Sequence, residues 1–488
     1  MSNDVATIGP FIGAVLVASA VLVSDLILPG RRAVATWVAL IGLTIVAILT
    51  LSIGAGGPRE AYGGAYKVDA LTTFLDILFV SIIALTIAFG PDYLEPRDLP
   101  VAEFATVLIF AMSGAMLISA ATDLLLLFLA LELMVLPGYL LAAYHKSDGY
   151  STEGAIKYFL LGSFSSAIFL FGLAFVWGLT GTTRVDQVAT ELARIASGAE
   201  AFSPGLAMGL AFMTTGVAFK IAAVPFHYWT PDAYQGSPTP VTGYLSVGPK
   251  VGAFALILRL FVEALPALKA DWLPVIVVLA AITMTLGNLV ALTQSNVKRM
   301  LAYSSIAHTG YMLVGLAAWA AGRIEGTQAL LFYGAAYAFM NLGAFAVVAA
   351  LQRRAGVTSS LDTFAGLIRR EPWLAVLMTL FLLSLTGIPP TAGFFAKAYV
   401  ILAAVEAGGA VGILAVITML NAAAAAFYYL RVVVYMWMRD PVTEGSGTTH
   451  GPLLWAGLAV TGVLTVVLGF FPGVLDAVGQ AALALGGA

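Results

Sequence analysis

Apolar stretches of about twenty residues, joined by short polar connections, constrain this chain more than any other feature. A helix needs about 20 apolar residues to cross the hydrocarbon core of a bilayer. Only 10% of the residues are charged, whereas a soluble domain carries about 25%. Because no soluble fold could cover so much apolar surface, we predict an all-α polytopic membrane protein.

Fourteen apolar stretches predict about fourteen transmembrane helices. They lie at residues 8–28, 33–53, 69–89, 100–120, 123–143, 156–179, 205–225, 239–262, 272–293, 299–321, 327–351, 374–400, 409–437 and 453–475. The N-terminus lacks the charged region and cleavage site of a signal peptide, so we interpret the first stretch as a retained span. Residues 185–198 have apolar positions at helical spacing, which fits an interfacial helix or an ordinary surface helix.

The distribution of positive charge predicts the orientation. Loops on one side carry eleven lysines and arginines, Lys298 and Arg299 among them, whereas loops on the other side carry six. Cytoplasmic loops of membrane proteins are enriched in these residues. We therefore expect the cation-rich side to face the cytoplasm. With an even number of spans, both termini would then face the periplasm of a bacterial inner membrane.

The composition excludes several kinds of chemistry. The chain has no cysteine, so it cannot form disulfides, thiolate metal sites, iron–sulfur ligation or a cysteine nucleophile. With only four histidines, we expect no metal site. The net charge of −3 gives no basic field for nucleic acid. The sequence shows no strands, no phosphate-binding loop and no nucleophile–base arrangement.

Charged residues inside the predicted spans are the candidate functional residues. They are Glu132, Lys157, Lys220, Lys250 and Lys397. A charge at the bilayer centre costs roughly 2.5–3.5 kcal/mol, so such residues need a reason. Lys220, Lys250 and Lys397 are too deep to reach the headgroups. Lys157 stands at the start of its span and could reach them instead.

The five candidates suit proton transfer. Burial disfavours the charged form of a lysine, whereas a nearby carboxylate favours it. Movement of Glu132 toward or away from Lys220 would therefore switch that lysine between holding and releasing a proton; a purely structural pairing of Glu132 with a lysine is the alternative. His227, His308 and Tyr303 are possible relay groups, although a structural role fits the two histidines equally well.

Other polar residues divide between the interior and the span ends. We expect Tyr228, Thr230, Ser246, Asn288, Ser304, Ser305, Tyr337 and Asn341 to bridge the interior. Arg259 lies near the end of its span, where its guanidinium could extend to the headgroups. Asp76 could be a helix-packing or an interfacial residue.

Two predicted helices are interrupted by proline and glycine. In helix 7, Pro225 follows Lys220 and frees the carbonyl of Ile221. In helix 12, the run TGIPPTAGFFAK frees the carbonyls of Leu385 and Thr386 just before Lys397. Irregular backbone at membrane depth survives only where protein or a water-filled cavity satisfies it.

The interrupted helices occupy matching places, fourth in helices 4–8 and fourth in helices 9–13. Because five helices is an odd number, this predicts two inverted five-helix repeats with a transport site between them. The expected organisation is a three-helix segment at 1–99, the first repeat at 100–262, the second repeat at 272–437 and helix 14 within 438–488.

Four stretches resemble a known family, the antiporter-like subunits of respiratory complex I. They are LELMVLPGYLLAAYHKSDGYSTEGAIKYFLLGSFSSAIFLFG, FKIAAVPFHYWTPDAYQGSPTPVTGYLSVGPKVGAFALILR, GNLVALTQSNVKRMLAYSSIAHTGYMLVGL and LTGIPPTAGFFAKAYVI. The resemblance covers roughly residues 70–440. A lysine at position 397 and an end soon after helix 14 make the chain most similar to the subunit N family, the relatives of mitochondrial subunit 2.

The resemblance implies a proton-translocating subunit of an NADH:quinone oxidoreductase. Glu132 and Lys220 match the family's glutamate–lysine pair, Lys157 and Lys250 match further lysines of its central axis, and Lys397 matches the helix 12 residue on the exit or connection side. NADH, FMN, iron–sulfur clusters and quinone would belong to partner subunits, and other membrane-arm subunits would be the neighbours. The alternatives are a subunit of a multi-subunit cation/proton antiporter, a ferredoxin- or formate-linked relative, and a passive scaffold of the membrane arm.

Overall fold

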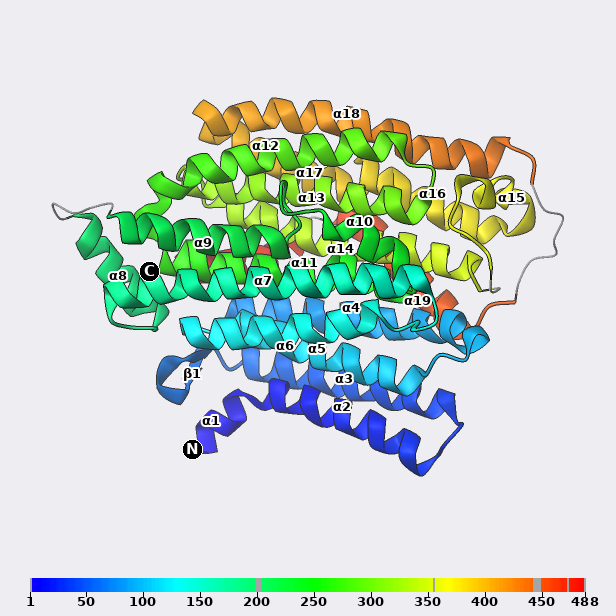
Figure 1. Cartoon of the computed structure of the whole chain (residues 1–488), viewed down its shortest axis with the longest axis horizontal. Coiled ribbons are helices and arrows are strands. Elements are labelled where there is room, and N and C mark those ends of the chain that lie inside the picture. The colour runs from blue at the N-terminus through cyan, green and yellow to red at the C-terminus, as the bar shows by residue number, and fades with distance from the viewer. Residues whose placement is uncertain (1, 198–202, 354–355, 442–448, 472–473, 487–488) are drawn as a thin grey trace.

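The computed structural model describes residues 2–197, 203–353, 356–441, 449–471 and 474–486. Long, nearly parallel helices form one bundle (Figure 1). The helices are α1 (Ser2–Thr7), α2 (Gly9–Ile27), α3 (Arg32–Gly54), α4 (Ala70–Leu94), α5 (Val101–Ala120), α6 (Leu124–Ala142), α7 (Gly149–Thr180), α8 (Val185–Ala196), α9 (Pro204–Lys220), α10 (Trp229–Gly236), α11 (Thr239–Ile257), α12 (Lys269–Thr293), α13 (Val297–Ala320), α14 (Glu325–Leu351), α15 (Leu367–Arg370), α16 (Pro372–Thr386), α17 (Ala392–Ala407), α18 (Gly409–Met438), α19 (Pro452–Phe470) and α20 (Val474–Gly486). The expectation of no strands was wrong, because a short antiparallel hairpin, β1 (Arg59–Ala61) and β2 (Tyr66–Val68), precedes α4.

Apolar length identified the helices correctly. Within the described residues, eleven helices are long and apolar enough to cross a membrane, and α16 is a shorter apolar helix. Every predicted span coincides with one helix or with a pair of helices, and α8 forms where helical spacing suggested it. The protein is therefore an all-α, multi-pass membrane protein. The total of fourteen spans and the inverted repeats stay predictions.

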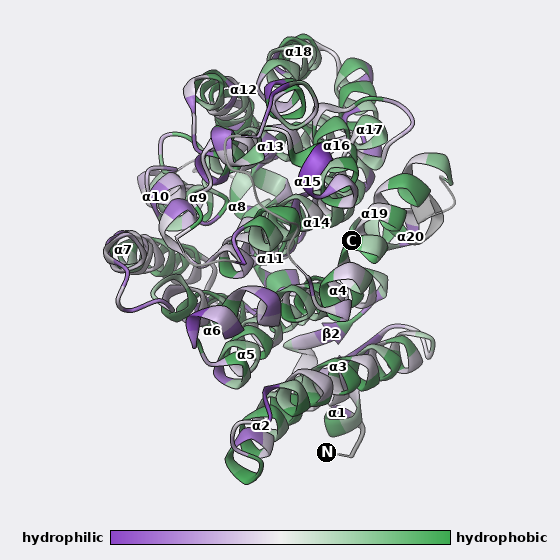
Figure 2. Ribbon diagram, turned by 90° about the vertical axis from the view of Figure 1, so that its right-hand side faces the viewer, coloured by the Kyte–Doolittle hydropathy of each residue, from purple (hydrophilic) through white to green (hydrophobic). Residues whose placement is uncertain are grey.

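Helices α11, α13 and α14 form the centre of the bundle, and the other long helices surround them (Figure 2). Small residues let these helices pack closely. At Gly310 of α13, a Cβ atom would lie 2.5 Å from the backbone nitrogen of Met284 in α12. Any side chain at this position would therefore push the two helices apart.

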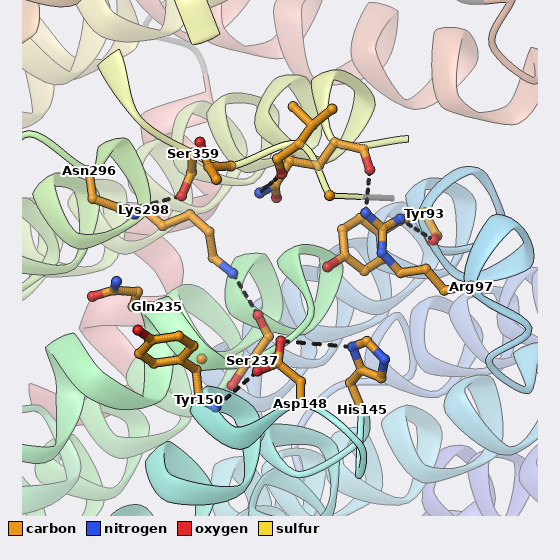
Figure 3. A pocket seen from close by; sticks show the side chains of 15 residues that line it. Tyr93, Arg97, His145, Asp148, Tyr150, Gln235, Ser237, Asn296, Lys298 and Ser359 are labelled. Carbon is orange, nitrogen blue, oxygen red and sulfur yellow. Dashed lines mark hydrogen bonds and ion pairs between the residues drawn. The ribbon is translucent and has the colours of Figure 1, made fainter. Parts of the chain in front are cut away.

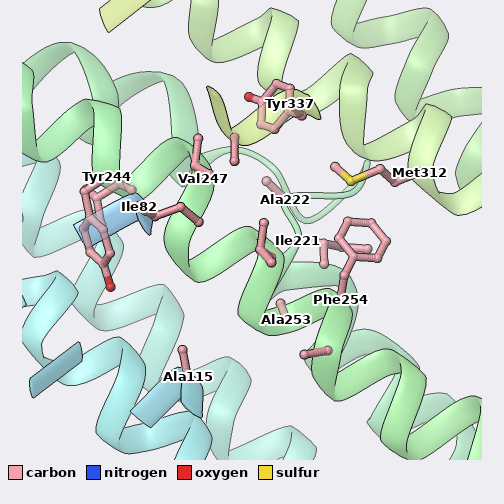
Figure 4. Packing of buried hydrophobic residues seen from close by; sticks show 14 of the residues in the cluster. Ile82, Ala115, Ile221, Ala222, Tyr244, Val247, Ala253, Phe254, Met312 and Tyr337 are labelled. Carbon is pink, nitrogen blue, oxygen red and sulfur yellow. The ribbon is translucent and has the colours of Figure 1, made fainter. Parts of the chain in front are cut away.

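Apolar side chains pack around the end of α9. Ile221 and Ala222 leave the helix there and lie near Phe254 of α11 and Met312 of α13 (Figure 4). All four residues are buried. They form a closely packed apolar region around the first interruption, so the polar groups of the interior are embedded in an apolar surrounding.

Arg259 is fully buried and does not extend to the headgroups, so that expectation was wrong. It lies in a π-helical segment, Leu258–Ala264, that continues α11. Its guanidinium donates to both carboxylate oxygens of Asp69 at 3.0 Å and to Glu263 at 2.6 Å. The loop between α3 and α4 brings Asp69 to it, and buried charges need such pairing. Nearby, Asp76 is buried and accepts a hydrogen bond from Ser119.

A histidine anchors the start of α19 to the rest of the bundle. The side chain of His450 is 1% exposed, and its two ring nitrogens lie 2.8 Å from Asp92 of α4 and 2.9 Å from Glu371 next to α16. Asp92 also accepts from the backbone N–H of Gly451 and from Arg353. This cluster, the His450 clasp, joins four separate parts of the chain.

Helix α20 was not predicted. It packs against α4 and α14. The segment is too short to span a bilayer and follows a predicted span directly, so apolar length alone could not separate it from a tail.

Candidate functional site

The first interruption places Lys220 inside the bundle. Helix α9 ends at Lys220, and regular helix resumes only at α10. The carbonyl of Ile221, which the sequence predicted to be free, accepts a hydrogen bond from Thr309 of α13 at 2.7 Å. Lys220 is 7% exposed and donates to Ser166 Oγ of α7 at 2.8 Å and to the carbonyl of Gly162 at 3.5 Å. The Thr309 side chain therefore provides the hydrogen bond that the carbonyl at the interruption lacks, and neutral oxygens bind the lysine ammonium.

Glu132 lies on α6, close enough to Lys220 to interact with it electrostatically. No carboxylate of the described residues lies within 4.0 Å of the Lys220 ammonium. Glu132 Oε1 is buried and has no hydrogen-bond partner in the described part of the chain. The two residues thus lie on helices that both pack against α7, and they are not in direct contact in this conformation.

The second interruption forms a site of the same kind around Lys397. Helix α16 ends at Thr386 and α17 begins at Ala392. Lys397 is 5% exposed and donates to the carbonyls of Leu385 at 2.9 Å and Thr386 at 2.7 Å. These are the two carbonyls that the sequence predicted to be free. The interrupted helix therefore supplies the oxygens that hold its own lysine.

Lys250 lies on α11 in the middle of the bundle and is 3% exposed. Its ammonium donates to Ser305 of α13, at 2.6 Å to the hydroxyl and also to the carbonyl. It also lies 5.7 Å from the ring centre of Tyr337. Like Lys220 and Lys397, Lys250 has only neutral partners among the described residues.

His308 lies in the interior of α13 and is 1% exposed. Its ring nitrogens contact two tyrosine hydroxyls, Nδ1 that of Tyr333 at 2.7 Å and Nε2 that of Tyr429 at 3.3 Å. The hydroxyl of Tyr429 also contacts Ser304. Hydroxyls and imidazoles both donate and accept, so this group of residues can pass a proton along.

His308 lies between two of the lysines. Its ring packs against Tyr337, at 4.9 Å between ring centres, and against Tyr311, at 5.6 Å. Tyr337 lies under Lys250, and the ammonium of Lys397 is 5.2 Å from the centre of the Tyr311 ring. Side chains of α13 and α14 therefore connect Lys250 to Lys397 through the centre of the protein.

Lys157 lies apart from the buried lysines, near the cation-rich end of the bundle. Its side chain is 43% exposed and pairs with Asp232 of α10 at 2.7 Å and Glu153 at 2.6 Å. Asp232 also binds Arg299 at 2.8 Å. Lys157 is thus part of a charged cluster at the edge of the protein.

The remaining relay candidates occupy different surroundings. His227 is buried in the first interruption, and its Nδ1 has no hydrogen-bond partner among the described residues. Tyr303 is half-buried beneath the guanidinium of Arg299. Tyr228 is 72% exposed in this chain, so its expected place in the interior was wrong. It follows His227 directly in the turn between α9 and α10, and its ring stacks on that of His227 at 4.6 Å between ring centres.

A cavity of about 520 Å³ opens on the cation-rich side (Figure 3). Polar and charged residues line it, among them Arg97, His145, Asp148 and Lys298. The sequence placed Lys298 in a loop, yet it is 4% exposed and donates to the carbonyl of Ser237 at 2.6 Å. The segment after α14 covers it, since Val297 donates to the carbonyl of Ser359.

Sequence reasoning missed several of these contacts. Ser166, Tyr311, Tyr333, Tyr429 and Asp232 all contact candidate residues, but none was singled out. Serine and tyrosine are common in membrane helices, and their position on a helix does not tell which neighbour they face. The buried lysines were recognised because a charge in an apolar run is rare.

Three comparisons with known proteins show which family the chain belongs to. The family model described as NADH:quinone oxidoreductase/Mrp antiporter, TM matches residues 121–421, which include every candidate residue. The NADH-quinone oxidoreductase subunit N of Trichlorobacter lovleyi is 39% identical over 96% of this chain and 94% of that protein. A chain of respiratory complex I from Thermus thermophilus is 32% identical, with a TM-score of 0.78 over 96% of this chain and 99% of that chain.

A chain of the Mrp complex from Dietzia sp. is 21% identical, with a TM-score of 0.84 over 99% of this chain and 98% of that chain, and this similarity shows the fold alone. Relatives that are nearly 40% identical over almost the whole length identify the protein family without ambiguity. The chain belongs to the NADH:quinone oxidoreductase/Mrp antiporter transmembrane family, and within it to the subunit N family of NADH-quinone oxidoreductase.

Proposed function

We propose that this chain is a proton-translocating membrane-arm subunit of an NADH:quinone oxidoreductase. One observation carries the proposal: Lys220, Lys250 and Lys397 are buried, and only neutral oxygens hold their ammonium groups. A buried ammonium without a counter-ion is costly unless its charge can be given up. Groups with this property are suited to binding and releasing protons.

Proton transfer along the interior would involve one movement of Glu132 and two transfers between lysines. Glu132 controls Lys220 by approaching or leaving it, Lys220 exchanges a proton with Lys250, and Ser305 and His308 pass it on toward Lys397. His227, in the first interruption, and Tyr303, beneath Arg299, would be secondary relay groups. Lys157 and Asp232 would exchange protons between the edge of the bundle and the path. Moving one proton against 100 mV takes roughly 2.3 kcal/mol, which is of the order that separating a buried ion pair can supply.

The redox chemistry would take place in partner subunits, which would hold NADH, FMN, iron–sulfur clusters and quinone. This chain would act as part of the translocase through contact with other membrane-arm subunits. We place it in a bacterial inner membrane with the cation-rich loops in the cytoplasm and both termini in the periplasm. The excess of lysine and arginine on that side supports this orientation.

A subunit of a cation/proton antiporter is the second candidate, favoured by the similarity of fold to the Mrp complex. The two functions differ in their driving force, since an antiporter exchanges protons for cations without an electron donor. Sodium-driven proton exchange by this chain without NADH would favour the antiporter.

The experiment compares Glu132→Ala and Lys220→Ala with the wild type in inverted membrane vesicles that contain the assembled complex. We expect each substitution to lower the initial rate of NADH-driven proton uptake about tenfold or more, because each removes a charged group of the transfer path. The amount of assembled complex is measured in the same vesicles. Unchanged proton uptake per electron in both variants would overturn the proposed function and favour a passive scaffold.

A further inference from the structure

In this conformation the ammonium of Lys220 forms its hydrogen bonds with residues of α7. Helix α7 packs against both α6, which carries Glu132, and α9, which ends at Lys220 (Figure 2). The ammonium lies 2.8 Å from Ser166 Oγ and 3.5 Å from the carbonyl of Gly162, one helical turn earlier. Ser166 is 4% exposed, so bulk solvent does not compete for this hydroxyl.

The two oxygens form a weak binding place for an ammonium. The contact to Ser166 has ordinary hydrogen-bond length, whereas 3.5 Å to Gly162 is at the limit. A carboxylate binds an ammonium more strongly than a neutral hydroxyl does. Glu132 has a buried oxygen without a partner in the described residues, so it could accept the ammonium. A switch requires a second binding place for the ammonium besides Glu132, and without Ser166 only the long contact to the carbonyl of Gly162 would remain on α7.

We infer that Ser166 is a positioning residue that holds Lys220 away from Glu132, and that the lysine alternates between Ser166 and Glu132 during proton transfer. This inference rests on the proposed function. Ser166 does not exchange the proton itself. It stabilises the unpaired conformation of Lys220, from which the proton can pass to Lys250, and it keeps the ion pair with Glu132 from being permanent.

The adjacent serine provides a matched control. Ser165 is also 4% exposed, but its hydroxyl donates to the carbonyl of Gly216 on α9 at 3.2 Å and does not contact Lys220. Ser165→Ala therefore removes one buried hydroxyl between the same two helices and leaves the lysine untouched. Ser166→Thr keeps a hydroxyl at the tested position.

The test measures NADH-driven proton uptake in inverted vesicles that contain the assembled complex. We expect Ser166→Ala to lower the initial rate roughly tenfold. The free energy of a hydrogen bond to a charged group is large enough to account for a roughly tenfold change in rate. Ser165→Ala should stay within about twofold of the wild type. Ser166→Thr should recover most of the rate. In a Glu132→Gln background, Ser166→Ala should cause no further loss, because the carboxylate that captures the lysine is gone.

Equal rates for Ser166→Ala and Ser165→Ala would overturn the inference, as would a Ser166→Thr variant as slow as Ser166→Ala. An additional tenfold loss in the Glu132→Gln background would also overturn it. Lys220→Ala, measured in the same vesicles, separates this inference from the proposed function. If Lys220→Ala pumps normally, the proposed function fails; if it does not pump and the serine variants behave alike, only the role of Ser166 fails.

Discussion

The His450 clasp should make the anchoring of α19 depend on pH. A neutral imidazole has one N–H donor, whereas His450 faces a carboxylate at each ring nitrogen. Burial by itself disfavours the charged ring, but the hydrogen bonds and charges of Asp92 and Glu371 outweigh it and raise the pKa of His450 from 6.5 to about 9. The clasp therefore holds a charged imidazolium at neutral pH.

The size and sign of the effect follow from this pKa. One pKa unit corresponds to about 1.4 kcal/mol, so the rise from 6.5 to about 9 is worth about 3 kcal/mol at most. Because the pKa is raised in the folded state, the stabilisation is complete below about pH 6.5 and is lost as the pH rises through about 9. His450→Gln lacks the charge and should lose the stabilisation at every pH in this range.

Hydrogen exchange of the Gly451 amide is a direct assay, since this N–H donates to Asp92 at 2.9 Å. After correction for the intrinsic exchange rate, protection in the wild type should fall up to about 100-fold between pH 6 and pH 10. His450→Gln should show low protection at both pH values. Protection that is equal at both pH values in the wild type, or that persists in His450→Gln, would refute the reasoning.

Three further results are expected. Gly393→Ala should prevent assembly or stop proton uptake, because its Cβ would lie 1.8 Å from a backbone oxygen of α16. The control is Gly334→Ala, whose Cβ meets nothing within 4 Å and which should assemble normally in membrane fractions. Arg259→Ala should destabilise the protein by roughly 3–5 kcal/mol, since it leaves buried carboxylates unpaired; Arg32→Ala, which removes an exposed ion pair, should cost less than about 1 kcal/mol in the same thermal unfolding experiment. Because the chain has no cysteine, Lys146→Cys can be labelled selectively, and a membrane-impermeant maleimide should modify this chain in inverted vesicles but not in intact cells; the reverse result would show that the orientation is wrong.

The two helix interruptions show which structural features can be predicted from local sequence alone. Proline removes a donor and displaces a carbonyl wherever it occurs in a helix, so the free carbonyls of Leu385 and Thr386 could be predicted without a fold. The sequence also placed Lys397 close by, and the structure shows it bound to both oxygens. Such contacts are local, since about one helical turn of chain and a short loop contain every group involved.

Contacts between distant segments could not be predicted in this way. The contact of Lys220 with Ser166 depends on which face of α7 meets α9, and Arg259 met Asp69 only because the α3–α4 loop reaches the end of α11. The exposure of Tyr228 could not be predicted either, since the residue lies in the turn between α9 and α10 and not on a continuous helix. Apolar sequence reports how deep a residue lies along a helix axis, and it carries little information on the direction of the side chain around that axis.

The sequence by itself determined that the chain is a bundle of membrane-spanning helices with interruptions at two places and lysines in its interior. These features follow from apolar length, from proline and from the cost of a buried charge, each of which acts within one segment. Only the tertiary structure decided which oxygens hold each lysine and that His308 lies between Lys250 and Lys397. Those contacts depend on how each helix is rotated about its axis and how the helices pack against one another. Both are determined jointly by residues that are far apart in the chain.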